Sequence, residues 1–207
     1  MRRRSNFDDR HRLRMENYEL ATQTVVNSLR PGHPVGYVTY GNPMNYDKVA
    51  ENLVKHAMRS HLSFKVIPGV SSLDTVLCDL GVDIAPGIQI YDASWLWACR
   101  MRPSLDVSVL LMQVGMFGSL RTHYGNRRDG NSLAELVQYL QRFYPPSHTS
   151  FLVCSTGSEE HPARIRQIEL GRLTSVSSED LGGASLYIPA LTKPEVQHDS
   201  LNRMQEE

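Results

Sequence analysis

Two short loops of this 207-residue chain combine small, rigid and polar residues, as a ligand-binding backbone requires. They are Tyr40–Met44 and Pro68–Ser72. Gly41 and Gly69 have no side chain to hold a ligand away, and the prolines beside them stiffen both turns. A third loop, at 113–118, adds the polar side chain of a glutamine. The combination suits an uncharged or zwitterionic adenosyl ligand, although each glycine or proline alone is more often only a turn residue.

Several other kinds of chemistry are not indicated by the sequence. It contains neither G-x-x-x-x-G-K-[ST] nor G-x-S-x-G, so a P-loop and an α/β-hydrolase nucleophile are not expected. The three cysteines include no C-x-x-C pair, and the eight histidines lack ligand spacing, so no metal site is predicted. Basic and acidic residues balance at 22 each, which does not favour a nucleic-acid partner. The arginine-rich first residues are typical of a solvated arm.

The first half of the chain predicts helices that alternate with strands. Apolar residues recur at helical spacing from Arg14 to Leu29 and again from Val49 to Met58. Short β-prone segments are expected to form strands, and they span 35–40, 62–67 and 89–91. Ser71 and Asp74 form a capping-box pattern before a third helix, and Gly81 suits its end.

The second half contains more predicted strands. The segment 107–114 is apolar on both faces, which is typical of a central strand. A loop at 115–131 and a helix from Ser132 follow, and further strands are expected at 151–154, 164–170 and 184–188. We therefore predict an α/β fold of two subdomains, 1–103 with a parallel sheet and 104–192 with a mixed sheet, and a disordered tail at 193–207. The ligand is expected in a cleft between them, beyond the carboxyl ends of the strands.

Four motifs in this order resemble the tetrapyrrole methylase superfamily, the class III methyltransferases that use S-adenosylmethionine. They are "YGNP", "VIPGVSSLDTVLCDLGVD", "LLMQVG" and "LYIPAL". The pair "RMENYELATQTVV" and "GYVTYGNP" is most similar to the borosin-type peptide backbone N-methyltransferases. The resemblance covers about residues 12 to 191 and implies S-adenosylmethionine as cofactor and a homodimer as the assembly.

The resemblance also implies roles for individual residues. Arg14 and Tyr18 match the Arg-x-x-x-Tyr pattern at the substrate end and share one helical face. They would stabilise charge on the peptide carbonyl and offer a hydrogen bond or proton path, whereas composition alone indicates a solvated arginine and a core tyrosine. The implied cofactor-binding residues are Tyr40, Gly41, Asn42, Met44, Ser71, Ser72, Gln113, Val114 and Tyr187. Asn42 stands where many members have Asp or His.

Three interpretations remain open at this stage. The first is a peptide N-methyltransferase whose substrate is a separate molecule, because no apolar core-peptide segment ends the chain. The second is a methyltransferase of tetrapyrroles or other small molecules. The third is a non-catalytic binding or scaffold protein, because the family's glycine-rich first strand is not found before the substrate helix. Without a signal peptide or an apolar span, the cytoplasm is the expected compartment.

Overall fold

The computed structural model describes residues 13–119, 132–156, 162–177 and 179–192. The chain divides into two compact units. Residues 13–82 make up most of the first, and residues 83–117, 132–154 and 164–192 make up most of the second. The division thus falls earlier in the chain than the expected break near residue 103. In the described part of the chain, no helix has the length and apolar character needed to cross a membrane.

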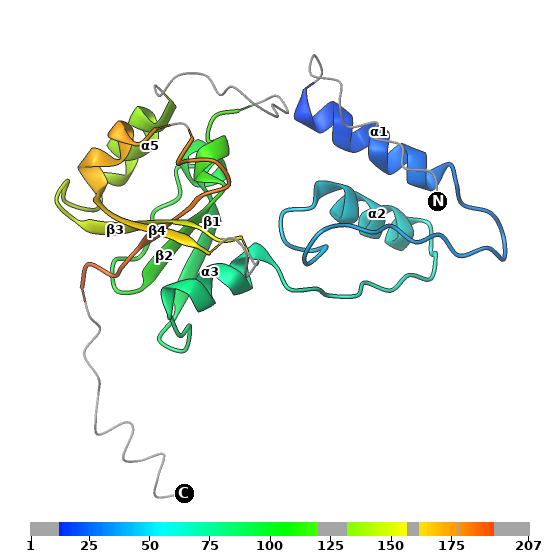
Figure 1. The fold of residues 1–207 in the computed structure, drawn as a ribbon. Coiled ribbons are helices and arrows are strands. Elements are labelled where there is room, and N and C mark those ends of the chain that lie inside the picture. The colour runs from blue at the N-terminus through cyan, green and yellow to red at the C-terminus, as the bar shows by residue number, and fades with distance from the viewer. Residues whose placement is uncertain (1–12, 120–131, 157–161, 178, 193–207) are drawn as a thin grey trace, which may run out of the picture. The chain divides into compact units, whose positions relative to one another are not determined.

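The second unit contains a five-stranded mixed sheet, which confirms the α/β fold (Figure 1). Its strand order is β1-β2-β5-β3-β4. β1 and β2 pair in parallel, and the other three pairings are antiparallel. The strands are β1 (Ile88–Asp92), β2 (Ser108–Met112), β3 (Thr149–Cys154), β4 (Arg164–Glu169) and β5 (Ser185–Ile188). All five were predicted to within a few residues.

The hydrophobic core of the described chain lies in this second unit. β2 is an interior strand of the sheet, and four of its five residues are buried, as its apolar sequence predicted. Further core residues come from helices α4 (Ala93–Ala98) and α5 (Ser132–Leu140), from the 3-10 turns η1 (Val114–Met116) and η2 (Leu170–Ser175), from strands β3, β4 and β5, and from segments between these elements. α4 was not predicted, because six residues are too few for a helical period to show.

The described residues of the first unit form three helices, all predicted. They are α1 (Arg14–Val26), α2 (Lys48–Arg59) and α3 (Ser72–Leu80). α1 packs against α2. α2 begins where the Asp47 carboxylate accepts the Ala50 amide at 2.9 Å, and α3 ends at Gly81, whose φ of 63° is left-handed.

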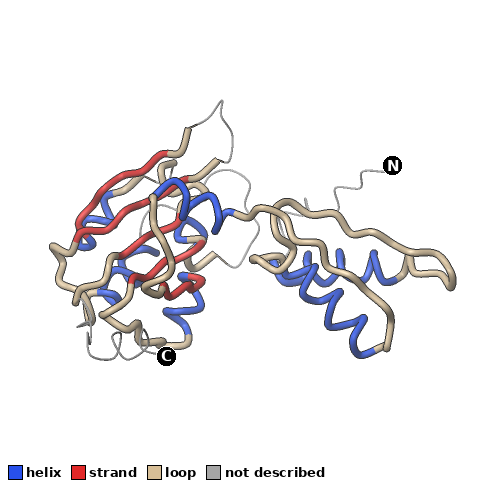
Figure 2. Tube along the Cα trace, turned by 90° about the horizontal axis from the view of Figure 1, so that it is seen from below, coloured by secondary structure: helices blue, strands red, loops and turns tan. Residues whose placement is uncertain are grey.

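The strands predicted at 35–40 and 62–67 are wrong. Both segments are coil, and Figure 2 shows the strands in the second unit alone. Among the described residues, no backbone N–H from 34 to 41 or from 63 to 70 donates to a backbone carbonyl. A β-prone segment becomes a strand only when a second strand takes up its hydrogen bonds. The parallel sheet expected in the first subdomain is therefore not formed.

Candidate functional site

The two predicted cofactor loops of the first unit meet backbone to backbone. Gly41 has a φ of 75°, which favours glycine. A Cβ added to Gly41 would lie 3.3 Å from the Val70 carbonyl oxygen and 3.5 Å from the Ser71 Cα. A Cβ added to Gly69 would lie only 2.8 Å from the Gly41 carbonyl oxygen. Both glycines are therefore needed for this approach, which brings together segments about thirty residues apart in the chain.

The Tyr40–Met44 loop is held by its own asparagine. The Asn42 side-chain oxygen accepts the Met44 amide at 2.9 Å, and the Asn42 carbonyl accepts the Asn45 amide at 2.9 Å. The Tyr40 side chain is 91% exposed. The side-chain oxygen of Asn42 thus shapes the loop, and its amide nitrogen is the group left for a ligand.

The Pro68–Ser72 loop leads directly into α3. Asp74 accepts hydrogen bonds from the Ser71 hydroxyl at 2.6 Å and from the Ser71 amide at 2.7 Å, so the predicted capping box is confirmed. The hydroxyl bond, followed by the amide bond, lowers the pKa of Asp74 below its ordinary value. Ser71 is buried and Ser72 is exposed, so Ser72 has the freer hydroxyl.

Helix α1 presents Arg14 and Tyr18 together, both half-buried. The Arg14 guanidinium has no hydrogen bond or ion pair with any residue that the structure describes. Tyr18 lies within electrostatic reach of Tyr37, whose hydroxyl donates to Asp47 at 3.0 Å. Burial, and then the Asp47 carboxylate, raise the pKa of Tyr37 to about 12.

Sequence reasoning missed Tyr37 and Asp47. Asp47 could have been found, because an aspartate directly before a helical period is a capping signal. Tyr37 could not, because its place beside Tyr18 depends on the packing of segments distant in sequence.

The remaining predicted residues belong to the second unit. Gln113 directly follows β2 and has a left-handed φ of 57°, a conformation that is uncommon outside glycine and clusters at functional sites. Val114 is buried directly after it. The Tyr187 hydroxyl donates at 2.9 Å to Ser108, at the opposite end of β2 from Gln113. The structure therefore groups Gln113 with Val114 but not with the Tyr187 hydroxyl.

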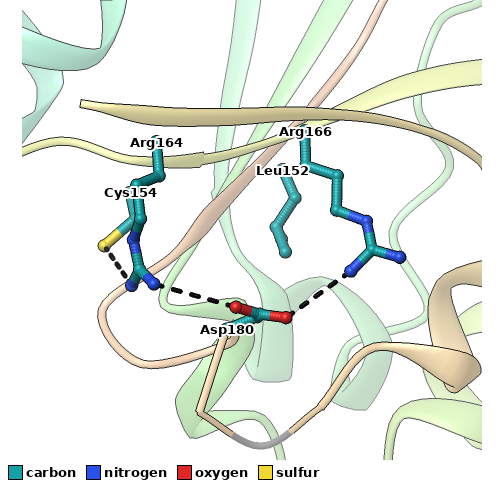
Figure 3. A pocket seen from close by; sticks show the side chains of 5 residues that line it. All are labelled: Leu152, Cys154, Arg164, Arg166 and Asp180. Carbon is teal, nitrogen blue, oxygen red and sulfur yellow. Dashed lines mark hydrogen bonds and ion pairs between the residues drawn. The ribbon is translucent and has the colours of Figure 1, made fainter. Parts of the chain in front are cut away.

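A small pocket beside β4 involves none of the predicted residues (Figure 3). Its volume is about 40 Å³, and its lining includes Cys154, Arg164, Arg166 and Asp180. Both guanidinium groups point at the Asp180 carboxylate, with nitrogen–oxygen distances of 3.7 and 3.5 Å. Such a volume admits a few water molecules at most, far below the roughly 300 Å³ of a small cofactor site.

Comparison with known proteins identifies relatives over most of the chain. The chain is 25% identical over 203 residues to a methyltransferase and dendrothelin A cyclic peptide precursor of Dendrothele bispora, covering 96% of this chain and 48% of that protein. It is 31% identical over 144 residues to a methyltransferase and type III borosin precursor of Anomoporia bombycina, covering 69% of this chain and 16% of that protein. The chain thus spans half or less of the length of these relatives.

Solved structures share the fold at low sequence identity. Diphthine synthase superposes with a TM-score of 0.55 at 17% identity, covering 98% of this chain and 73% of the other. Uroporphyrin-III C-methyltransferase of Thermus thermophilus, in complex with S-adenosylhomocysteine, gives 0.50 at 17% identity, covering 85% and 73%. Residues 2–173 match the sequence model of one family, which is most of the chain. The chain therefore belongs to the tetrapyrrole (corrin/porphyrin) methylases.

Proposed function

We propose that this protein is an S-adenosylmethionine-dependent methyltransferase that methylates backbone amide nitrogens of a peptide supplied as a separate molecule. Family membership and the peptide-precursor relatives support the reaction class. The observation that carries the proposal is the face of α1, where an unpaired, half-buried Arg14 stands one turn from Tyr18. A half-buried cation without a described partner suits a substrate on which negative charge develops.

The two glycine loops fit a cofactor of this kind. Their backbones approach each other at Gly41 and Gly69, where an added Cβ would crowd the other loop. The predicted cofactor-binding groups of the first unit are close to this contact in the sequence. They are Tyr40, the Asn42 amide nitrogen, Met44, Ser71 and Ser72. In the second unit, the predicted cofactor-binding residues are still Gln113, Val114 and Tyr187. When bound, S-adenosylmethionine supplies a methyl group that is already activated for transfer.

The protein's own residues have two tasks in such a reaction. An amide nitrogen is a poor nucleophile, so the negative charge that builds on its carbonyl oxygen must be stabilised, and Arg14 supplies the positive charge. The amide proton must also leave. Tyr18 offers the first hydrogen bond, and the neighbouring Tyr37–Asp47 pair provides a carboxylate that can finally receive the proton.

The first experiment is a calorimetric titration of S-adenosylmethionine into the purified chain. We expect saturable binding in the micromolar range, about −8 kcal/mol. Terminally blocked apolar peptides and uroporphyrinogen III are then compared as methyl acceptors by mass spectrometry. Methylation of a peptide supports the proposal, and methylation of uroporphyrinogen alone replaces it with the small-molecule alternative. A folded chain that binds no cofactor contradicts both and indicates a scaffold protein.

Variants of α1 then test the assigned roles. Arg14→Ala and Tyr18→Phe are each expected to lower turnover by about 10²-fold or more, with cofactor affinity unchanged. Arg59→Ala, an exposed arginine on α2, and Tyr91→Phe in the second unit are matched controls that keep full activity. Retained turnover in both α1 variants would exclude these roles. Our proposal includes a cytoplasmic homodimer. Light scattering at micromolar protein concentration tests the homodimer, and fractionation of cells that express the protein tests the compartment.

A further inference from the structure

Residues 35–41 of the first unit form a stretch whose backbone is unpaired. Among the described residues, none of its backbone N–H or C=O groups takes part in a hydrogen bond. Its side chains nevertheless alternate as they do along a strand. Tyr37 and Thr39 are half-buried, whereas Val38 and Tyr40 are 84% and 91% exposed. The segment therefore has the side-chain pattern of a strand without a strand beside it.

The inward-facing side of this segment is fixed to the rest of the first unit. The Tyr37 hydroxyl donates to the Asp47 carboxylate at 3.0 Å, and the same carboxylate caps α2. Tyr37 also lies within electrostatic reach of Tyr18 on α1. At its other end the segment continues into the Tyr40–Met44 loop. The free backbone therefore leads from the proposed methyl-transfer residues to the proposed cofactor loop.

A free strand edge offers hydrogen-bond donors and acceptors in alternation along its length. A second extended polypeptide matches this pattern, because its own backbone carries the same groups at the same spacing. We propose that the substrate peptide binds as a β-strand along residues 35–41, with its backbone N–H and C=O groups paired to those of the segment. This inference rests on the proposed function, and it adds that the peptide is recognised in an extended form by its main chain.

The side chains of the segment indicate which peptides fit. No residue from 35 to 41 is charged, and the exposed Val38 and Tyr40 are large and mostly apolar. Apolar substrate residues would pack on them as cross-strand neighbours. Pairing also needs a substrate N–H at every second residue. A methylated nitrogen has none, so a fully methylated product would bind more weakly than the substrate and leave.

Amide hydrogen exchange of the full chain in the presence of S-adenosylmethionine is the first test. The probe is the blocked peptide Ac-Gly-Val-Ile-Gly-Val-Ile-Gly-NH₂. We expect it to slow exchange of the amides at 35–41 by about tenfold or more, and to leave the second coil segment at 63–70 unchanged. The same peptide with every backbone nitrogen methylated should bind about tenfold more weakly in calorimetry and give no protection.

Proline substitutions test the pairing residue by residue. Proline removes one N–H, and in a strand only alternate residues bond to a given neighbour. Val38→Pro and Thr39→Pro should therefore differ, with one of them weakening peptide binding about tenfold relative to the alanine variant of the same position and the other matching its alanine variant. Because neither N–H is bonded within the described chain, both proline variants should melt close to the alanine variants and keep their cofactor affinity.

Three results would overturn the inference. The first is a wild-type chain that binds the two peptides equally or binds neither. The second is an equal effect of the two proline variants. The third is protection of 35–41 without any peptide, which would assign the edge to another segment of the chain or, where protection rises with protein concentration, to a second copy.

Failure of the proposed function is distinguishable from these results, because it is judged by methyl transfer. Transfer to a peptide without protection of 35–41 contradicts only the inference. Protection of 35–41 by the peptide without methyl transfer contradicts only the proposed function.

Discussion

Both units of this protein contain β-prone segments, but these segments form a sheet only in the second unit. In the second unit, most residues of β2 and β5 are buried and every described strand has a partner. In the first unit, the β-prone segments at 35–40 and 62–67 are coil, and Val38, Tyr40 and Ile67 are 84%, 91% and 70% exposed. The comparison shows that β-propensity is expressed only where the chain supplies a second strand.

Helices do not depend on such a partner, and they form in both units. The hydrogen bonds of α1, α2 and α3 are local, so packing of α1 against α2 and the caps at Asp47 and Ser71 are enough. A strand instead leaves its backbone groups unsatisfied until another strand arrives. In the described part of the first unit, the helices are therefore formed, whereas the backbone groups of the β-prone segments have no strand partner.

Amide hydrogen exchange should show the largest difference between the units. Amides of β2 and β5 are expected to exchange at least about 10³-fold more slowly than those of 34–41 and 63–70, because only the strands hold their N–H groups in buried bonds. Amides of α2 serve as an internal control with intermediate protection. Equal protection of the coil segments and the strands would mean that these segments find a β-partner in solution.

The same division limits what the sequence could predict. The helices and the strands around 107–114 and 184–188 were predictable, because a helical period or an apolar run is visible locally. The strands at 35–40 and 62–67 carried an equally good local signal, and they failed because pairing is a long-range property. In the site, the glycines at 41 and 69 were predictable from their residue type. The place of Tyr37 was not, because it depends on tertiary packing.

Matched valine substitutions should show a smaller but still clear difference. Val109 is fully buried in β2 and Val38 is 84% exposed. Val109→Ala is expected to lower the free energy of unfolding by about 2–3 kcal/mol, since it removes buried methyl groups and leaves a cavity. Val38→Ala should change it by less than about 0.5 kcal/mol. Urea unfolding measures both, and a large loss for Val38→Ala would mean that this face is covered in solution.

The cap of α3 tests whether local structure in the first unit stands without a sheet. Asp74→Ala should destabilise the protein by about 1 kcal/mol at pH 7, because it removes both bonds to Ser71. The folded-state pKa of Asp74 is lowered, so its contribution is present above the ordinary value of 3.8 and is lost as the pH falls below it. Urea unfolding from pH 7 to pH 3 should show this dependence in the wild type but not in the variant.

Glu19→Ala, at an exposed position of α1, removes one negative charge without removing a cap. It should therefore leave stability at pH 7 nearly unchanged. If Asp74→Ala is equally harmless, the α3 cap does not contribute in solution, and the first unit depends on something other than its local bonds.

The smallest expected effect concerns one buried tyrosine from each unit. The pKa of both Tyr37 and Tyr144 is raised to about 12, chiefly by burial. The contribution of each neutral hydroxyl is therefore present below the ordinary value of 10 and is lost as the pH rises through 12. The two hydroxyls differ in their bonding, because Tyr37 donates to Asp47, whereas the buried Tyr144 hydroxyl has no partner among the residues that the structure describes.

Phenylalanine substitutions should separate these two hydroxyls. Tyr37→Phe is expected to cost about 1 kcal/mol, because it removes a donor from the Asp47 carboxylate. Tyr144→Phe should cost nothing or stabilise by up to about 0.5 kcal/mol, because it removes an unsatisfied polar group and keeps the ring that packs on His148. Urea unfolding at pH 7 gives both values. A clear cost for Tyr144→Phe would show that its hydroxyl is bonded to water, and the second unit would then be less dry than its apolar core implies.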